Sequence, residues 1–201
     1  MVEASAQALK EWAAVEQVLG AGESALLLRK GGLWERREGF EVEHRQFWLF
    51  PTLYHQNPVE LCPELAWALE AAHAAQPGGE RIRLEHFAIV TDAWRVESLS
   101  ALRAIADQQA LTEETIESRV HYRNRPYLHA LVVRVHRLSD PHLVTNTLGY
   151  EGCVSWVALD EALPTRGAFP VLDEERFQEM RSRVAGHLAG PGVTRLEPGG
   201  G

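Results

Sequence analysis

The sequence predicts an α+β fold with a curved, mostly antiparallel sheet or partial barrel covered by three to five helices. Five segments are rich in apolar, β-branched and aromatic residues, and segments with helical periodicity or helix caps separate them. The chain has 201 residues, which is near the usual size of one domain. We therefore expect one domain over residues 1–189 and a disordered Gly- and Pro-rich tail over residues 190–201.

The predicted helices have apolar residues three or four positions apart, and Thr112 and Asp173 are suitable N-caps for two of them. These helices cover residues 4–19, 59–75, 98–109, 112–120 and 173–188. The predicted strands are bounded by turn residues such as Gly31, Gly32 and Pro51. They cover residues 25–29, 40–50, 81–96, 127–138 and 153–159.

Two of the predicted strands carry polar side chains on an otherwise apolar face. Side chains two residues apart share a face of a strand, which places His44 among aromatic residues and places His86 and Asp92 together. A histidine beside a carboxylate can bind a ligand or transfer a proton, so these three residues predict a polar site inside the core. The alternative is that each is a hydrogen-bonded core residue, or that a bulge turns it outward.

A second candidate site is a basic arm, residues 118–139, which holds five arginines, three histidines and no acidic residue. Arginines alternating with tyrosines are suited to neutralising phosphates and stacking on bases. This pattern predicts a contact with RNA, DNA or a nucleotide. The expected outer contacts are Arg119, Tyr122, Arg123 and Arg125, and the contacts nearer the sheet are Arg29, Lys30 and Arg45. The alternative is that these arginines pair with acidic helix residues such as Glu113, Glu114 and Glu117.

A rival hypothesis is a metal-dependent hydrolase of phosphodiesters or nucleotides. Carboxylates on one strand can hold a divalent ion that activates water, and Glu41, Glu43, His44, His86 and Asp92 are the candidates. The sequence has no P-loop, HExxH, GxSxG or CxxC motif, so it predicts neither a bound cofactor nor an assigned metal site. A protein-interaction module is a third possibility, because the net charge is −8. These residues leave open whether the protein is an enzyme.

Composition also bears on location. No apolar run approaches the roughly 20 residues that span a bilayer, and the N-terminus lacks the basic and apolar regions of a secretory signal. Cys62 and Cys153 are the only cysteines, too few for a disulfide framework. We therefore expect a cytoplasmic protein without a membrane partner.

Four stretches carry a resemblance that covers nearly the whole predicted domain. They are LLLRKGG at 26–32, FEVEHRQFWLFPTLYHQ at 40–56, SRVHYRNRPYLHALVVRVHRL at 118–138 and YEGCVSW at 150–156. The chain resembles a bacterial family known only as a domain of unknown function, which implies no activity. More weakly, residues 22–29 are similar to the opening of ASCH-type, PUA-like RNA-binding barrels. The G-x-K-x-x-E-x-R pattern of those barrels lacks its lysine and glutamate here, so Arg29 and Lys30 alone remain as contacts that this likeness implies.

Overall fold

The computed structural model describes residues 1–30, 35–36, 39–40, 44–54, 56–78, 80–122, 125–150, 152 and 154–196, with the main chain alone at 35–36 and 39–40. Its strands are β1 (Ala4–Trp12), β2 (Leu26–Arg29), β3 (Glu35–Arg36), β4 (Gly39–Phe40), β5 (Gln46–Thr52), β6 (Arg81–Val96), β7 (Leu128–Thr145), β8 (Trp156–Pro164), β9 (Ala168–Pro170) and β10 (Val193–Leu196). Its α-helices are α1 (Ala13–Gly20), α2 (Trp67–Ala75), α3 (Leu99–Ala104), α4 (Glu113–His121) and α5 (Glu174–His187). Short 3-10 helices are η1 (Pro58–Glu60), η2 (Pro63–Leu65), η3 (Ala106–Gln108) and η5 (Leu148–Tyr150).

One sheet organises the molecule, with its main strands in the order β2-β7-β6-β5-β1-β8. Strand β10 adds to β6, and β9 adds to β7. The β1–β5 pair is parallel, whereas the other pairs in this sheet are antiparallel. Within the described ranges β2 and β8 are the unpaired ends of this order, so the sheet is open. The predicted α+β class with a mostly antiparallel sheet is confirmed.

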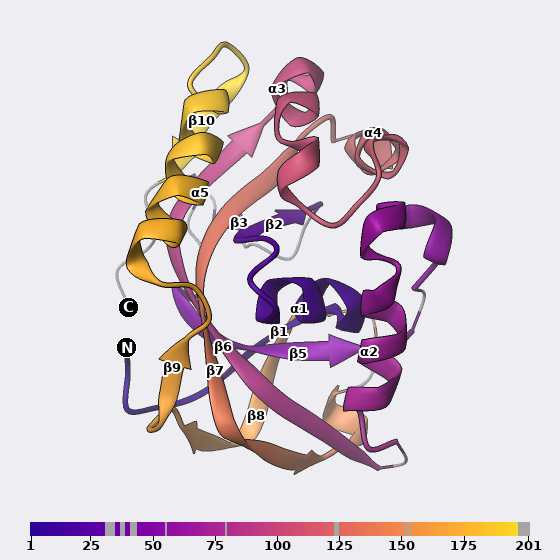
Figure 1. Cartoon of the computed structure of the whole chain (residues 1–201), viewed down its shortest axis with the longest axis vertical. Coiled ribbons are helices and arrows are strands. Elements are labelled where there is room, and N and C mark those ends of the chain that lie inside the picture. The colour runs from indigo at the N-terminus through magenta and orange to yellow at the C-terminus, as the bar shows by residue number, and fades with distance from the viewer. Residues whose placement is uncertain are drawn as a thin grey trace.

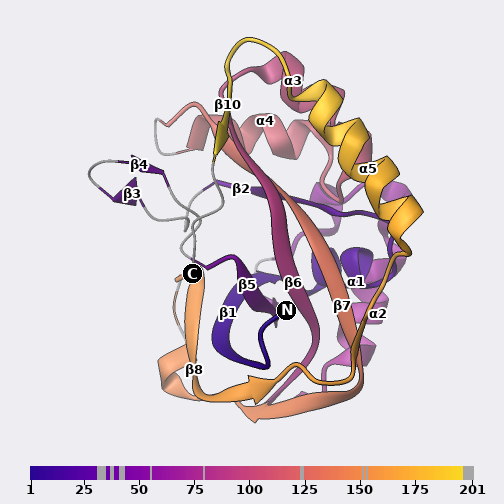
Figure 2. The same ribbon diagram turned by 90° about the vertical axis from the view of Figure 1, so that its left-hand side faces the viewer.

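The long strands β6 and β7 bend along the length of the molecule, and α5 lies on one side of them with β8 on the opposite side (Figures 1 and 2). Helix α1 follows β1 directly and packs against α2. The largest fully buried side chains include Trp48 and Phe47 of β5 and Phe87 of β6. The aromatic run of β5 therefore lies at the centre of the core, as expected from strong β-forming residues in an inner strand. In the described part of the chain, no helix has the length and apolar character required to cross a membrane.

Two predicted caps are confirmed. The Thr112 hydroxyl accepts a hydrogen bond from the Thr115 amide at 3.3 Å, at the start of α4. The Asp173 carboxylate accepts one from the Arg176 amide at 2.7 Å, at the start of α5. A cap bonds to amides that lie two or three residues away, so sequence locates it well.

The prediction of a helix over residues 4–19 is wrong for its first part. Residues 4–12 form β1, and the helix begins only at Ala13. The spacing of Leu9 and Trp12 suits either element. Pairing with β5 on one side and β8 on the other favours the strand, because differences in helix propensity are smaller than about 1 kcal/mol per residue.

Two other predictions need correction. The helix predicted over 59–75 begins only at Trp67, because Pro63 lacks an amide hydrogen and disfavours helical geometry at Cys62. Residues 193–196 were predicted as disordered, but they form β10, which pairs with the edge of β6 beyond the end of β5. The rest of the predicted tail, residues 197–201, lies outside the described residues.

Candidate functional site

Arg29, the last residue of β2, bridges the open ends of the sheet. Its Nη1 donates to the Lys10 carbonyl at 2.8 Å and to the Glu11 carboxylate at 2.7 Å, and its Nη2 donates to the Ser155 hydroxyl at 3.0 Å. Glu11 is only 7% exposed, and a buried carboxylate requires such a partner. Arg29 was predicted as a nucleic-acid contact, but its hydrogen bonds hold β2 against β1 and the residue before β8.

Lys30 holds the chain that follows α4. Its ammonium donates to the carbonyl oxygens of Val120 at 2.5 Å and Tyr127 at 3.2 Å, and also to that of Arg125. Burial lowers the pKa of Lys30, and the charge of Arg125 lowers it further. The ammonium group of a lysine has three N–H donors, and here three carbonyl oxygens accept hydrogen bonds from them. The side chain of Lys30 therefore anchors the basic arm beside β2.

Arg119, near the end of α4, lies on the ring of Trp12 at the end of β1. Its guanidinium carbon is 4.7 Å from the ring centroid, and its Nη2 is 3.8 Å from the Glu60 carboxylate, beyond hydrogen-bonding distance. Burial lowers the pKa of Arg119, while the charges of Glu11 and Glu60 act in the opposite direction. The side chain is 26% exposed, and a guanidinium keeps its charge in proteins. Arg119 is therefore a fixed cation that solvent reaches.

A small pocket lined in part by Arg119 has room for about one water molecule. Arg119 and Glu11 supply its charged walls, and Gln109 contributes a side chain whose amide bonds to Leu111 and Ala106. Its remaining walls are mostly apolar and include the side chains of β2. The pocket is therefore lined by both charged and apolar side chains.

Tyr122 and Arg125 follow α4 directly, and both are exposed. With the residues above they form one group, the Arg119 cluster, which we define as Glu11, Trp12, Arg29, Lys30, Glu60, Arg119, Tyr122 and Arg125. The cluster contains four cations and two carboxylates, so it is positively charged in a protein whose net charge is −8. The fold therefore gathers five of the seven predicted nucleic-acid contacts.

The other two predicted contacts do not join this group. Arg45 lies just before β5, where its Nε donates to the Val90 carbonyl at 3.2 Å. Thr52, at the far end of β5, pairs with Trp12, so Arg45 is roughly 20 Å from Trp12 at about 3.3 Å per residue. Arg123 lies outside the described residues.

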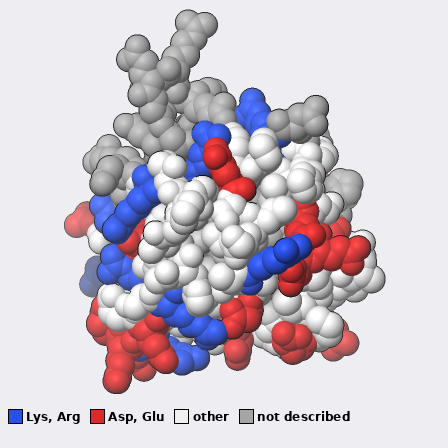
Figure 3. Space-filling model, turned by 90° about the horizontal axis from the view of Figure 1, so that it is seen from above, with Lys and Arg blue, Asp and Glu red and all other residues white. Residues whose placement is uncertain are grey.

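The alternative pairing predicted for the arm is present in part, because Arg134 lies 3.1 Å from the Glu174 carboxylate of α5 and Arg119 lies 3.8 Å from that of Glu60. Glu113 and Glu117 of α4 contact Arg103, which lies on α3. Seen from the end of the molecule where α3 and α4 lie, blue basic atoms border red acidic atoms around a central surface that is mostly white (Figure 3). Glu113 and Glu117 therefore pair with α3, while Glu11 and Glu60 are carboxylates that contact Arg29 and Arg119.

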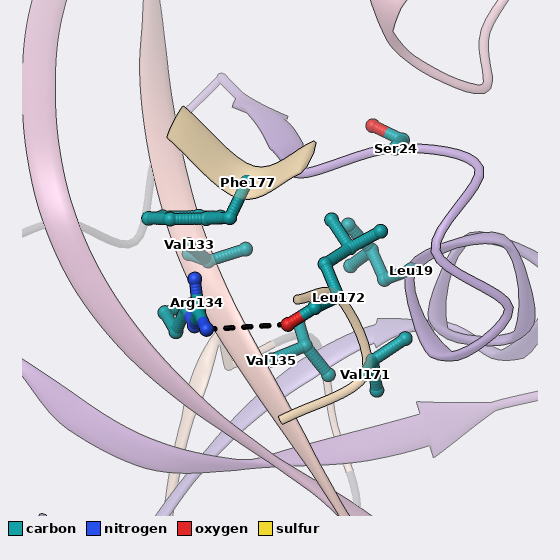
Figure 4. A pocket seen from close by; sticks show the side chains of 8 residues that line it. All are labelled: Leu19, Ser24, Val133, Arg134, Val135, Val171, Leu172 and Phe177. Carbon is teal, nitrogen blue, oxygen red and sulfur yellow. Dashed lines mark hydrogen bonds between the residues drawn. The ribbon is translucent and has the colours of Figure 1, made fainter. Parts of the chain in front are cut away.

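Two further arginines of the arm have internal roles. Arg134 donates a hydrogen bond to the Leu172 carbonyl at 3.2 Å, and its guanidinium carbon lies 4.5 Å from the Phe177 ring centroid. Arg134, Leu172 and Phe177 line a small pocket together (Figure 4). Arg137 pairs with the buried Glu85 at 2.6 Å. These contacts attach β7 to the chain around α5 and to β6.

The structure does not bring His44, His86 and Asp92 together. His86 Nδ1 lies 2.5 Å from the buried Glu16 carboxylate, whereas the His44 ring contacts Trp156 with centroids 5.0 Å apart. His86 and Asp92 are six residues apart on β6, which corresponds to roughly 20 Å. Register shifts beside both residues break the simple alternation that predicted a shared face.

Asp92 instead accepts hydrogen bonds from Arg181 of α5 at 2.5 Å and Arg195 of β10 at 2.6 Å. Burial alone would raise the pKa of Asp92, but hydrogen bonds from Arg181 and Thr91 and the two arginine charges outweigh it and lower the pKa. Asp92 therefore fastens α5 and β10 to β6.

The hydrolase candidates do not form a site in the described ranges. Glu41 and Glu43 lie outside them. Among the residues that are described, no three His, Cys, Asp or Glu side chains gather as a metal site would require. This geometry therefore places no ligand set around a divalent ion.

Three members of the cluster were not predicted as site residues from the sequence: Glu11, Trp12 and Glu60. The first two were assigned to a helix, and Glu60 was assigned to a second helix that begins later. The neighbouring residues Glu11 and Trp12 were the signal in the sequence that could have pointed to this part of the cluster. Their contacts with Arg29 and Arg119 join residues 18 to 107 positions apart, which local patterns do not reveal.

The chain was compared with known proteins. No curated protein matches it. Among solved structures, it is similar to the crystal structure of ASCH from Zymomonas mobilis, with 11% sequence identity, a TM-score of 0.43, and coverage of 88% of this chain and 93% of that one. A mutant of the same protein gives 11% identity, a TM-score of 0.42, and coverage of 88% and 96%.

The weaker resemblance noted in the sequence was to barrels of this type, but we draw no fold, ligand or activity from a likeness at this level. The stronger resemblance was to a family without an assigned function. Residues 8–183 match the family described as "Domain of unknown function (DUF1802)", and the chain therefore belongs to that family.

Proposed function

We propose that this protein binds nucleic acid through the Arg119 cluster. The observation that carries the proposal is the position of Arg119, which lies 4.7 Å from the Trp12 ring centroid while its side chain is 26% exposed. Arginine suits phosphate because its planar N–H groups match two oxygens at once. A cation that is already oriented loses less side-chain entropy when it binds.

The surrounding residues support this role by fixing the cluster. Arg29 ties β2 to β1, and Lys30 ties the chain after α4 to the end of β2. These hydrogen bonds hold the chain segments next to Arg119 and Arg125 in place, and a binding site requires such rigid support. The weak contact with Glu60, at 3.8 Å, leaves Arg119 with donors that a phosphate can occupy.

The charge of the cluster also favours an anionic ligand. Four cations and two carboxylates give it a net charge of about +2, opposite in sign to the whole chain. A local positive region of this kind attracts a polyanion even when the total charge is negative. The proposed role is binding without catalysis, and it fits the cytoplasmic location expected from the sequence.

Fluorescence anisotropy of short labelled RNA and DNA strands, measured between about 50 and 200 mM salt, tests the proposal. The test variant is Arg119→Gln/Arg125→Gln. The control is Arg166→Gln/Arg176→Gln, which removes the same charge from exposed positions outside the cluster.

We expect binding that weakens as salt rises. Each lost phosphate contact reduces the slope of log K against log salt by about 0.7, so the test variant should lose roughly 1.4. The control should keep the slope of the natural protein. An absence of binding at low salt, or an equal loss in both variants, contradicts the proposal.

A further inference from the structure

Two tyrosines near the Arg119–Trp12 pair, one in the sequence and one in the sheet, are exposed. Tyr54 is 82% exposed and Tyr122 is 57% exposed. An exposed aromatic ring near a cationic group can serve as a stacking surface for a base. Tyr122 was predicted from the sequence as a contact, and Tyr54 was not.

Tyr122 follows Arg119 closely in the sequence, and the backbone of Tyr54 lies near that of Trp12. Tyr122 comes three residues after it, and side chains at this spacing on a helix are about 5–6 Å apart at Cβ. Tyr54 comes two residues after Thr52, which pairs directly with Trp12. At about 4.8 Å between strands and 3.3 Å per residue, the Tyr54 backbone is within roughly 10 Å of Trp12.

We propose that the Arg119 cluster binds single-stranded nucleic acid, with bases stacked on Tyr54 and Tyr122 and phosphates held by Arg119 and Arg125. This inference rests on the proposed function and names its ligand class. A base offers its flat face to a protein ring only when it is not enclosed in a duplex. Exposed tyrosine rings can stack on bases, and arginines can bind the phosphates of the same strand.

Helix α4 is poorly suited to the alternative, a duplex read by a helix in the major groove. That mode requires a helix that enters the groove between two phosphate backbones. The nine residues of α4 include Glu113, Glu114 and Glu117, which would repel those phosphates. Its basic side chains, Arg119 and His121, are confined to the last turn.

The test compares labelled single-stranded RNA, single-stranded DNA and the corresponding duplexes. The variants Tyr54→Leu and Tyr122→Leu keep an apolar side chain and remove the ring. The variants Tyr54→Phe and Tyr122→Phe keep the ring. Phe169→Leu is the control, because this exposed aromatic residue lies on β9, which pairs with residues 136–138 of β7.

We expect both single strands to bind at least about tenfold more tightly than the duplexes. Each Tyr→Leu change should weaken binding by about 5- to 100-fold, while each Tyr→Phe change should stay within about twofold. The Phe169→Leu variant should bind like the natural protein.

Two failures are distinguishable. Duplexes that bind as tightly as single strands, or Tyr→Leu variants that match Phe169→Leu, would overturn the single-strand inference while the effect of Arg119→Gln/Arg125→Gln still supports nucleic-acid binding. An absence of binding to every probe would overturn the proposed function itself.

Discussion

The guanidinium group of Arg119 lies 4.7 Å from the centroid of the Trp12 ring, and this contact joins the end of α4 to the end of β1. A cation over an indole ring is stabilised by about 0.5–1 kcal/mol when exposed and by about 2 kcal/mol when desolvated. The ring also orients the guanidinium. The pair thus connects the sheet with the proposed binding surface.

Replacing Trp12 by leucine should weaken nucleic-acid binding by about 2- to 30-fold, because Arg119 loses the ring that orients it. The change Trp12→Phe should retain most of the affinity, since phenylalanine also presents a ring face. Anisotropy titrations measure the affinity, and thermal unfolding shows whether each variant is folded. A folded Trp12→Leu protein with unchanged affinity would contradict this role of the ring.

Replacing Glu60 by glutamine should strengthen binding by up to about fivefold, because the carboxylate competes with phosphate for Arg119 and exposed ion pairs contribute at most about 1 kcal/mol. The Glu60 carbonyl still accepts the Thr112 amide, so the local fold should persist. The same titration on Glu64→Gln, a nearby carboxylate on η2, is the control. Equal gains in both variants would indicate a general charge effect instead.

Replacing Lys30 by methionine should lower the unfolding free energy by about 1–3 kcal/mol, since carbonyls of residues 120, 125 and 127 lose their donor. Denaturant unfolding measures this loss, and hydrogen exchange should become faster over residues 120–127. Lys10, the only other lysine, donates to the Gly152 carbonyl and is the matched control. Equal losses in Lys30→Met and Lys10→Met would argue against a special anchoring role.

Replacing Gly20 by alanine should destabilise the protein, although alanine usually favours a helix by about 1 kcal/mol. A Cβ at Gly20 would lie 2.3 Å from Nε2 of His86, a ring that Glu16 holds in place. We expect a loss of about 1–3 kcal/mol from overpacking. A double-mutant cycle with His86→Ala provides the check, because the cost of Gly20→Ala should largely disappear once the ring is gone.

Replacing Asp92 by asparagine should remove a stabilisation that depends on pH. The pKa of Asp92 is lowered in the folded protein, so the carboxylate stabilises the fold above its unfolded pKa of about 3.9, and this contribution is lost as the pH falls through the folded pKa. We expect Asp92→Asn to cost about 1–3 kcal/mol at neutral pH and progressively less below about pH 4. Unfolding curves across this range measure the difference, and a cost that does not change with pH would show that the carboxylate charge is not responsible.

Much of the fold followed from local patterns. Strand β6 has the predicted bounds of residues 81–96, and the caps Thr112 and Asp173 begin α4 and α5 as expected. The segment 4–12 was assigned to a helix because its apolar spacing fits both periods. Only its neighbours β5 and β8 select the strand.

The candidate site was predictable to a smaller extent. Arg119, Tyr122 and Arg125 are close in sequence, so one basic arm already grouped them. Whether a cation points to solvent or to a carbonyl depends on what other segments place beside it. Arg29 and Lys30 were predicted as nucleic-acid contacts nearer the sheet, while the fold gives both side chains internal hydrogen bonds.

Local patterns predicted the α+β class, five of the ten described strands and two helix caps, because these depend on side-chain periodicity and on hydrogen bonds between residues a few positions apart. Long-range packing places Trp12 against Arg119, Glu16 and not Asp92 against His86, and β10 along the edge of β6. These contacts join residues 70 to 107 positions apart or pair distant strands. Their geometry is fixed when the whole chain buries its apolar surface, so no local pattern specifies them.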